Sequence, residues 1–347
     1  MKIGFNITAL KSGHKTRGIG SYTRNLLDQL NKMDNLQVVE FEDINEISDV
    51  DLVHYPVFDL FKRTLPLKKK FPTVVTIHDI IPLIFVKHYP AGIIGSINLL
   101  QQKYSLRGVQ AVITDSKASQ NDIAKNLNIP LHKIFPIYLG VTDNFRAIKD
   151  QKKLKSIAEK YHLPNEFVLY IGSTNWNKNL STLAKACVSS SRNLVLIGAG
   201  FDQRENLDHP ELKSFKNFLA EFEGNSLIKT LGFIEENDLV SIINLAEIVL
   251  LPSLYEGFGL PILEAQACGV PVVTSKASSM PEVAGEGAIL INPESVEEIK
   301  NAIDVLNSDS AKRKDLIKKG FENVAKFSWE KTAKETFKVY RSVLEKS

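Results

Sequence analysis

Short apolar runs rich in β-branched residues alternate with amphipathic segments along nearly the whole chain. This alternation is typical of parallel sheets covered by helices, because doubly buried strands read as apolar runs and covering helices as periodic patterns. Ten strands are predicted in two groups of five: residues 2–7, 52–55, 73–77, 111–114 and 134–136, then 167–171, 194–197, 228–231, 248–251 and 270–274. The predicted fold class is therefore α/β, with two similar units in succession.

A charged segment separates the two groups of strands. Residues 147–166 are rich in lysine and end on a helix stop that contains Pro164. We place the boundary there, which gives an N-terminal domain over residues 1–147 and a C-terminal domain over residues 148–328. Residues 329–347 have apolar side chains at helical spacing, among them Phe337 and Tyr340. They predict a final helix that packs back toward the N-terminal domain.

Composition narrows the class of protein. The 347 residues suffice for two domains, and 44% hydrophobic with 24% charged residues is close to the globular average. Cys187 and Cys268 lie far apart without a C-x-x-C spacing, which argues against a disulfide framework or a cysteine zinc site and fits a reducing cytoplasm. No apolar run approaches the roughly 18 to 20 residues of a membrane span, and the first residues lack the apolar core of a signal peptide. We therefore expect a cytoplasmic protein.

The positive charge is concentrated in the N-terminal part. The formal net charge is +3, and residues 1–150 contain 19 Lys and Arg against 14 Asp and Glu. A local basic cluster contains Lys62, Arg63, Lys68, Lys69 and Lys70. Two interpretations stay open for it, a solvated face and a weak contact with an anionic surface such as the inner face of a membrane. The excess is too small and diffuse to indicate nucleic acid.

The most informative stretch is 253–269, which reads Ser-Leu-Tyr-Glu-Gly-Phe-Gly-Leu-Pro-Ile-Leu-Glu-Ala-Gln-Ala-Cys-Gly. It follows a predicted strand, and Pro261 suits the first turn of a helix. Gly257 and Gly259 allow a close backbone approach to a ligand, and the helix N-terminus favours an anion such as a diphosphate. Glu256 and Glu264 bracket this anion site.

Carboxylates accept hydrogen bonds, so Glu256 and Glu264 are suited to hydroxyl groups rather than to phosphate. A nucleotide sugar has this pattern, with sugar hydroxyls for Glu256, a ribose diol for Glu264 and the diphosphate between them. The alternative is an ordinary strand, loop and helix in which Glu264 is a solvated helix residue.

The stretch resembles the E-x7-E signature of retaining glycosyltransferases of family 4, which have the GT-B fold of two Rossmann-like domains with a cleft between them. Further motifs extend the resemblance over nearly the whole chain: Gly269-Val-Pro-Val-Val, Met280-Pro-Glu-Val-Ala, Tyr170-Ile-Gly-Ser, Asn177-Lys178-Asn179 and Arg17-Gly-Ile-Gly-Ser-Tyr. The resemblance implies that Glu256 contacts the transferred sugar, Glu264 the ribose and Lys178 the diphosphate.

Two positions depart from the family pattern. Many members carry Arg where this chain has Ser173, and the Arg that often precedes the lysine is Asn177 here. The leaving diphosphate then has fewer cationic partners. We expect Lys178 with backbone amides, or a further cation from the N-terminal domain, to compensate. We assign Ser173, Gly257, Phe258, Gly259 and Leu260 to the donor site.

Two N-terminal motifs complete the expected site. The glycine-rich segment 12–20 enters a helix, and the resemblance assigns Gly18 and Gly20 to donor binding, with Arg17 as our candidate for the missing cation. The alternative is a surface loop with an incidental arginine. His78 follows a predicted strand at its carboxyl end, where α/β sheets bind ligands. The resemblance suggests that His78 orients the sugar as a catalytic residue, whereas the alternative is a structural histidine.

Two other motifs are set aside. Gly198-Ala-Gly200 lacks the third glycine of a dinucleotide fingerprint, and Asp49-Val50-Asp51 precedes a strand, at the wrong end for a metal site. No metal site and no cofactor are predicted.

The sequence thus indicates a metal-independent, retaining hexosyltransferase with Glu256, Lys178 and His78 at its centre. Its expected donor is a nucleotide sugar, with GDP-mannose weakly preferred over UDP-sugars, and its expected acceptor is a glycan or lipid-linked glycan. Two alternatives stay open: a sugar-nucleotide epimerase or hydrolase, and a degenerate glycosyltransferase that serves as a binding subunit.

Overall fold

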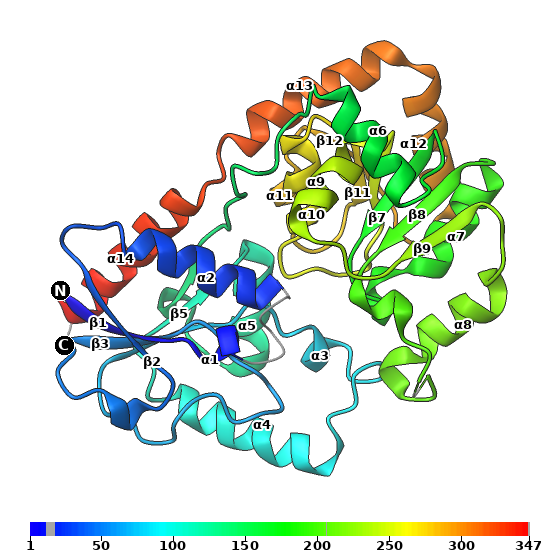
Figure 1. Ribbon diagram of the computed structural model, residues 1–347. Coiled ribbons are helices and arrows are strands. Elements are labelled where there is room, and N and C mark those ends of the chain that lie inside the picture. Colours follow the sequence, from blue (N-terminus) through cyan, green and yellow to red (C-terminus); the bar gives the residue numbers. More distant parts are fainter. Residues whose placement is uncertain (12–17, 206, 346–347) are drawn as a thin grey trace. The chain divides into compact units, whose positions relative to one another are not determined.

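The computed structural model describes residues 1–11, 18–205 and 207–345 (Figure 1). The chain divides into two compact units. Unit 1 comprises Met1–Gly140 and Phe327–Ser347, and unit 2 comprises Val141–Lys326. No helix in the described ranges is long and apolar enough to cross a membrane.

Unit 1 is built on a sheet of six parallel strands in the order β2-β1-β3-β4-β5-β6. Its strands are β1 (Lys2–Asn6), β2 (Gln37–Phe41), β3 (Leu52–Tyr55), β4 (Thr73–Thr76), β5 (Ala111–Thr114) and β6 (Ile134–Pro136). Its helices are α1 (Thr8–Lys11), α2 (Gly18–Leu30), α3 (Ile81–Ile84), α4 (Gly92–Leu106), α5 (Lys117–Leu127) and α14 (Trp329–Leu344). All residues of β3, β4 and β5 are buried, which explains their apolar sequences.

The last helix belongs to the core of unit 1. Helix α14 packs beside α2, and the Thr332 hydroxyl donates to the Tyr138 carbonyl at 2.8 Å. Ser328 caps the helix by accepting from the Lys331 amide. Gly140 meets its first turn so closely that a Cβ atom would lie 2.1 Å from the Trp329 nitrogen. Unit 1 is therefore assembled from both ends of the chain.

Unit 2 has a second sheet of six parallel strands, in the order β12-β11-β10-β7-β8-β9. Its strands are β7 (Phe167–Ile171), β8 (Asn193–Ile197), β9 (Ile228–Leu231), β10 (Ile248–Leu251), β11 (Val272–Ser275) and β12 (Ala288–Ile291). Its helices are α6 (Gln151–Lys160), α7 (Leu180–Ser189), α8 (Lys213–Phe222), α9 (Glu236–Leu245), α10 (Leu260–Ala267), α11 (Met280–Ala284), α12 (Val296–Ser308) and α13 (Ser310–Val324). The strand order changes direction between β7 and β10, which are neighbours in the sheet.

The structure confirms the predicted α/β class and all ten predicted strands, and it adds β2 and β12 at sheet edges. The bounds of four strands differ by one or two residues from the prediction, and the largest difference is at β11. Strand β11 begins at Val272 rather than at residue 270. Pro271 precedes the strand and has no amide hydrogen to donate to the ladder.

Candidate active site and its relatives

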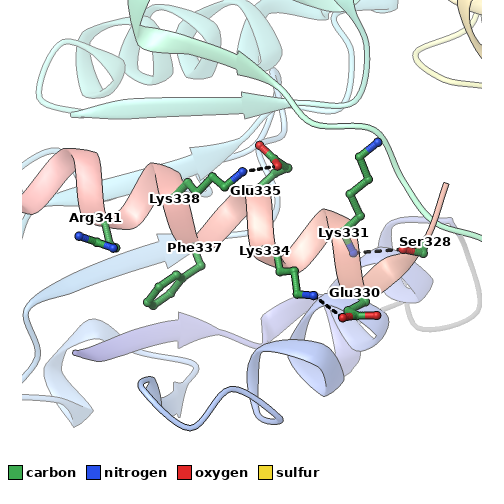
Figure 2. A pocket seen from close by; sticks show the side chains of 8 residues that line it. All are labelled: Ser328, Glu330, Lys331, Lys334, Glu335, Phe337, Lys338 and Arg341. Carbon is green, nitrogen blue, oxygen red and sulfur yellow. Dashed lines mark hydrogen bonds and ion pairs between the residues drawn. The ribbon is translucent and has the colours of Figure 1, made fainter. Parts of the chain in front are cut away.

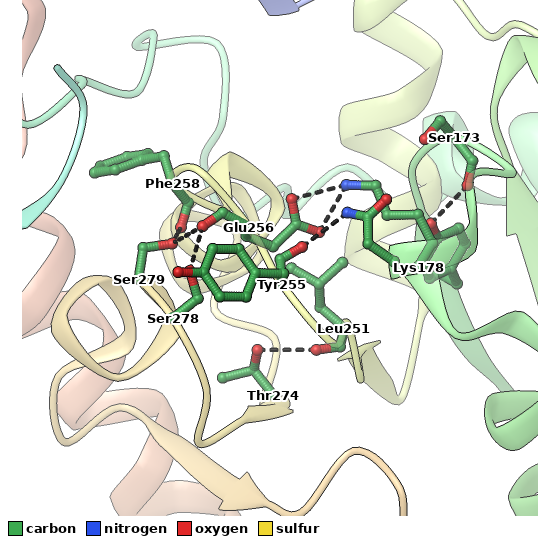
Figure 3. A network of polar contacts seen from close by, with 11 residues as sticks. Ser173, Lys178, Leu251, Tyr255, Glu256, Phe258, Thr274, Ser278 and Ser279 are labelled. Atoms are coloured by element: carbon green, nitrogen blue, oxygen red, sulfur yellow. Dashed lines mark hydrogen bonds and ion pairs between the residues drawn. The ribbon is translucent and has the colours of Figure 1, made fainter. Parts of the chain in front are cut away.

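The candidate site in unit 2 lies at the carboxyl ends of β7, β10 and β11. In parallel α/β sheets ligands bind at this edge, next to the point where the strand order reverses. Here that point falls between β7 and β10. The loops after these strands carry Lys178 and Glu256, and the loop after β11 carries Ser278 and Ser279 (Figure 3).

Lys178 ends a single 3-10 turn, Trp176–Lys178, directly before α7. Asn179 follows in the left-handed conformation with φ 58°, and its side-chain amide donates to the carbonyls of Pro252 and Pro293. Asn177 is buried and links this turn to the loop after β10. Its carbonyl accepts from the Leu254 amide at 2.7 Å, and its side chain donates to the Tyr255 carbonyl at 2.8 Å. Asn177 therefore joins two loops.

Glu256 is held by the loop that follows β11. Ser279 donates to the carbonyls of Glu256 and Phe258 at 2.9 and 2.8 Å, and Ser278 donates to the Glu256 carbonyl at 2.6 Å (Figure 3). Gly259 then lies at the N-cap of α10 with φ 107°, a conformation that favours glycine. These contacts fix the backbone that presents Glu256.

Lys178 and Glu256 form an ion pair at the centre of this arrangement. The lysine Nζ lies 2.6 Å from Oε1 and 2.8 Å from Oε2, and the side chains are 17% and 10% exposed. Sequence reasoning assigned the two residues separate partners, and the structure brings them together. An ammonium group has three hydrogens, so one remains for another acceptor. The pair can thus present a cation and a carboxylate to one ligand.

Glu264 lies on α10, one turn beyond the helix start, and is partly buried. Burial raises the pKa of its carboxyl to about 7, and the charge of Glu236 contributes. Glu264 is thus a partly buried helix residue, and its role at the ribose stays a prediction. Hydrogen-bond donors that favour the ionised form would lower this pKa again.

The remaining donor-site candidates of unit 2 lie around these residues. Gly257 and Phe258 belong to the loop between β10 and α10, Phe258 is buried, and Leu260 is the first residue of the helix. Ser173 is exposed, and its carbonyl accepts from the Tyr170 hydroxyl at 2.8 Å. The Ser173 side chain is too short to replace an arginine.

Unit 1 has its own polar centre at the carboxyl ends of β4 and β5. His78 Nδ1 lies 2.8 Å from Asp115 Oδ2, and the two side chains are 15% and 6% exposed. Burial lowers the pKa of His78, but the charge and hydrogen bond of Asp115 raise it, with smaller contributions from Asp79 and the Pro56 carbonyl. The net pKa of His78 is raised. Nε2 has no hydrogen-bond partner among the described residues.

A buried network extends from this pair to α14. Tyr22 packs edge-on against His78, with ring centroids 4.6 Å apart, and its hydroxyl lies 2.9 Å from Thr76 Oγ1. His54 bonds to the same Thr76 oxygen at 2.9 Å and to the Tyr340 hydroxyl at 2.6 Å. Burial, with the nearby charge of His78, lowers the pKa of His54 to about 3, so it stays neutral. His54 is therefore structural.

Sequence reasoning missed Asp115, Ser278 and Ser279. A signal for Asp115 was present in the sequence. Asp115 directly follows β5, His78 is the second residue after β4, and these two strands are neighbours in the sheet. The two serines carry no comparable signal. Gly18 and Gly20 lie in the first turn of α2, with Gly20 buried. Arg17 lies outside the described residues.

The motifs that were set aside have structural roles. A Cβ atom on Gly198 would lie 1.9 Å from the Gly172 carbonyl oxygen, so this glycine permits close approach of the loops after β7 and β8. Asp51 accepts from the Lys2 amide at 2.8 Å, and Asp49 pairs with the Lys2 ammonium at 2.9 Å. No group of three or more His, Cys, Asp or Glu side chains in the described ranges could hold a metal ion.

A hollow of about 540 Å³ along α14 is a poor candidate for a site (Figure 2). All its lining residues lie on this helix or at its cap. Glu330 pairs with Lys334, and Glu335 lies 2.7 Å from Lys338. Its charges thus pair along the helix, as on ordinary exposed faces.

The fold and the site in unit 2 define a class of protein. The chain belongs to the glycosyl transferases group 1, whose family model matches residues 150–323. The model of Glycosyltransferase Family 4 matches residues 38–145. The two sheets are those of the GT-B fold, with a Rossmann-like arrangement in each unit.

Mannosyltransferases are among the similar proteins. The serotype-specific mannosyltransferase WbdA of Escherichia coli is 30% identical over 274 residues, which cover 75% of this chain and 32% of that protein. The chain thus spans about a third of the length of the first curated relatives it matches. The O-antigen chain mannosyltransferase B of Escherichia coli is 28% identical over 77% of this chain and 70% of its own length.

Solved structures share the fold at low identity. Sucrose-phosphate synthase from Thermosynechococcus elongatus matches with a TM-score of 0.75 at 19% identity, over 100% of both chains. HepE of Anabaena, solved in complex with UDP, matches with a TM-score of 0.75 at 17% identity, over 99% of this chain and 100% of that one.

Proposed function

We propose that this protein is a retaining glycosyltransferase that moves a hexose from a nucleotide-diphosphate sugar to a glycan or a lipid-linked glycan. The observation that carries the proposal is the Lys178–Glu256 ion pair at the carboxyl ends of β7 and β10. A cation next to a carboxylate matches a ligand that joins a diphosphate to a polyhydroxylated sugar. Membership of the group 1 glycosyl transferases supports the same reaction class.

Lys178 and the start of α10 are our candidates for the diphosphate. The third ammonium hydrogen of Lys178 binds a phosphate oxygen while Glu256 keeps the ammonium in place. The first amides of α10 supply further donors and the positive end of the helix dipole. Glu256 accepts hydrogen bonds from hydroxyls of the transferred sugar. Gly257, Phe258, Gly259, Leu260 and Ser173 form the walls of this site.

Retention follows from a front-face displacement in our proposal. The acceptor oxygen forms a bond to the anomeric carbon on the face from which the phosphate leaves. The carbon–oxygen bond to the phosphate breaks with its electron pair going to phosphate, and the acceptor hydroxyl proton passes to a departing phosphate oxygen. Glu256 is a poor covalent nucleophile, because both its oxygens are bound by Lys178. Catalysis then rests on positioning and on stabilisation of the leaving group.

Glu264 is our candidate for the ribose hydroxyls. Its raised pKa of about 7 means that a substantial fraction is protonated near neutral pH in the free protein. Ribose hydroxyls donate to the ionised form, so nucleotide binding should strengthen as pH rises from about 6 to 8. The same dependence should be absent in Glu264→Gln.

In unit 1, His78 is our candidate for a hydrogen bond to a sugar hydroxyl through Nε2. Asp115 is a positioning residue, because its bond to Nδ1 fixes the orientation of the ring and favours the protonated form. Gly18, Gly20 and Arg17 stay candidates for the donor site.

Mannose is the preferred sugar in this proposal, with GDP-mannose as donor. The relatives named as mannosyltransferases support it. A UDP-sugar is the second choice, since HepE was solved with UDP-glucose at 18% identity. We further propose that transfer needs no divalent metal, because Lys178 with a helix N-terminus supplies the positive charge. Full loss of transfer in excess EDTA, restored by Mg²⁺ or Mn²⁺, would contradict this last point.

The experiment that tests the function is a thermal-shift panel of GDP-mannose, UDP-glucose, UDP-galactose and UDP-N-acetylglucosamine. A ligand at 100 times its Kd stabilises the protein by about 2.7 kcal/mol, so the right donor should stand out. Transfer from that donor to a glycan acceptor, with the anomeric configuration read by NMR, then checks retention. Turnover of the donor without acceptor would indicate an epimerase or hydrolase, and donor binding without transfer to any glycan would indicate a degenerate binding subunit.

A further inference from the structure

The imidazole ring of His78 has two close neighbours of different kinds. Asp115 Oδ2 lies 2.8 Å from Nδ1. The ring of Tyr22, on α2, packs edge-on against the imidazole, with centroids 4.6 Å apart and an angle of 86° between the ring planes. Trp329, the first residue of α14, contacts the Tyr22 ring in turn, with centroids 6.0 Å apart. His78 is thus restrained by a carboxylate and by an aromatic ring.

Burial and one hydrogen bond fix the ring of Tyr22. Its side chain is 1% exposed and lies one turn after Gly18 on α2. Its hydroxyl lies 2.9 Å from Oγ1 of Thr76, the last residue of β4, which precedes His78 by two positions. Burial raises the pKa of the phenol, so Tyr22 stays neutral and takes part in hydrogen bonding. The hydroxyl therefore anchors the ring at its tip.

Thr76 is held by a hydrogen-bonded chain that ends on α14. His54 Nε2 lies 2.9 Å from Thr76 Oγ1, and His54 Nδ1 lies 2.6 Å from the Tyr340 hydroxyl. A neutral imidazole has one donor and one acceptor, so His54 can bond to both hydroxyls at once. All three side chains are 0% exposed, so water does not replace a bond that is lost here. The chain therefore fixes Thr76 and, through Thr76, the ring of Tyr22.

The imidazole needs more than one restraint to keep its direction. The bond to Asp115 holds Nδ1 but allows the ring plane to rotate about this contact. Nε2 is buried and has no hydrogen-bond partner among the described residues. An unpaired buried polar atom is costly, so an unrestrained ring would turn toward a partner. The Tyr22 ring, nearly perpendicular to the imidazole, opposes that rotation.

The titratable groups around His78 divide into those that set its charge and the one that contacts its ring. Burial lowers the pKa of His78, whereas the charges of Asp115 and Asp79 raise it. His54 is neutral, because burial and the charge of His78 lower its pKa to about 3. Tyr22 is neutral as well and makes the ring contact. Asp115 and Asp79 thus favour the protonated imidazole, and Tyr22 orients it.

We propose that Tyr22 is a positioning residue for His78, anchored by Thr76, and that it keeps Nε2 directed at the sugar hydroxyl during transfer. Aromatic rings in edge-on contact have a preferred geometry, which makes such a restraint directional. The inference rests on the proposed function, because it takes His78 as the group that bonds to the sugar. It also gives a role to the tyrosine of the Arg17-Gly-Ile-Gly-Ser-Tyr motif.

A double-mutant cycle between Tyr22 and His78 tests this proposal. Tyr22→Leu should lower kcat about tenfold or more, because misplaced groups lose catalytic power. The donor KM should change little, since the residues of unit 2 that bind the donor are intact. In the His78→Ala background, Tyr22→Leu should have no further effect on kcat, because a positioning residue acts only through the group it positions. An equal loss of kcat in both backgrounds would overturn the proposal.

Thr76 offers a matched pair of variants. Thr76→Val removes the hydroxyl and keeps the shape of the side chain. It should lower kcat and shift the NMR signals of the His78 ring protons, and Thr76→Ser, which keeps the hydroxyl, should return both toward the parent. The NMR signals require neither donor nor transfer, so they test the restraint independently of the reaction. Unchanged His78 signals in Thr76→Val would overturn the anchoring of Tyr22 by Thr76.

Phe41→Leu is the control for the loss of a buried aromatic ring. Phe41 lies in β2 of unit 1, is 2% exposed and contacts Tyr55. Its replacement should lower the free energy of unfolding without lowering kcat, and circular dichroism verifies that each variant is folded. Parental kcat in His78→Ala would remove His78 from the proposed function and this inference with it. A slow His78→Ala beside a Tyr22→Leu at the parental rate would overturn the inference alone.

Discussion

Asp115 controls the ionisation of His78 through a single short contact. The carboxylate lies 2.8 Å from Nδ1 in a buried setting, where the burial of the imidazole alone would lower its pKa. Asp115→Asn removes the negative charge and keeps a group of similar size. We expect the pKa of His78 to fall, as measured by NMR titration of its ring proton. Asp28→Asn, on the exposed face of α2, is the control, and an unchanged titration of His78 in Asp115→Asn would contradict the assignment.

The raised pKa of Glu264 predicts how the free energy of unfolding depends on pH. Its folded pKa is raised to about 7, so between about pH 4.5 and 7 the folded protein binds more protons than the unfolded chain. The free energy of unfolding should therefore lose a contribution as pH rises through this range. Glu264→Gln should remove that contribution, measured by urea unfolding at several pH values, while the exposed Glu286→Gln should behave as the parent. Identical pH profiles for all three proteins would show that Glu264 ionises normally.

Glu256→Gln tests the sugar contact without changing the shape of the site. Hydrogen bonds to charged groups are worth about 1.5–3 kcal/mol, so kcat/KM should fall about ten- to hundredfold with the fold intact. Glu322→Gln on α13, an exposed glutamate, provides the control. Transfer at the parent rate by Glu256→Gln would remove it from the mechanism.

Some residues of the candidate site could be singled out from the sequence, but the contacts between them could not. Glu256 and His78 could be singled out because each lies after a strand that is recognisable from its apolar run, whereas Lys178 was singled out by the resemblance to family 4. Their partners could not all be found, since the ion pair between Lys178 and Glu256 depends on β7 and β10 being neighbours. A strand order is set by the packing of the whole sheet and is not encoded in any local motif. No local sequence signal marks His54, because its role depends on Tyr340, 286 positions away in the sequence.

The loops after β7, β10 and β11 act as one element. Ser279 joins two of them through bonds to the carbonyls of Glu256 and Phe258. Ser279→Ala leaves buried carbonyls without this donor, and we expect a loss of about 1–3 kcal/mol in the free energy of unfolding. Donor affinity should fall too, because Glu256 loses part of its support. Ser308→Ala at the exposed end of α12 is the control, and a Ser279→Ala protein with parental stability would contradict the account of these loops.

Strands inside the two sheets could be predicted from the sequence more reliably than the strands at the sheet edges. The buried strands β3, β4, β5, β10 and β11 are rich in apolar and β-branched residues, because helices cover both faces of a parallel sheet. Strands β2 and β12 were missed. Both lie at sheet edges and have several partly or fully exposed residues, so their sequences lack a clear pattern.

Unit 1 depends on the return of the chain through α14. Tyr340 reaches His54 in β3 and is fully buried. Tyr340→Phe removes a hydroxyl and leaves His54 Nδ1 unpaired, so we expect a loss of about 1–3 kcal/mol in stability. Lys338→Gln on the exposed side of α14 should cost little, because exposed ion pairs contribute about 0–1 kcal/mol. Equal stabilities for the two variants in urea unfolding would contradict the role of this contact.

The central claim concerns the whole molecule: unit 2 binds a nucleotide sugar through the Lys178–Glu256 pair. Isothermal titration of the donor found in the panel into the parent, Lys178→Ala and Lys318→Ala proteins tests it most directly. The account predicts equal affinity for the parent and Lys318→Ala, whose lysine is exposed on α13. It predicts a loss of about 1.5–3 kcal/mol in binding free energy for a folded Lys178→Ala. Binding by Lys178→Ala with the affinity of the parent would contradict the account.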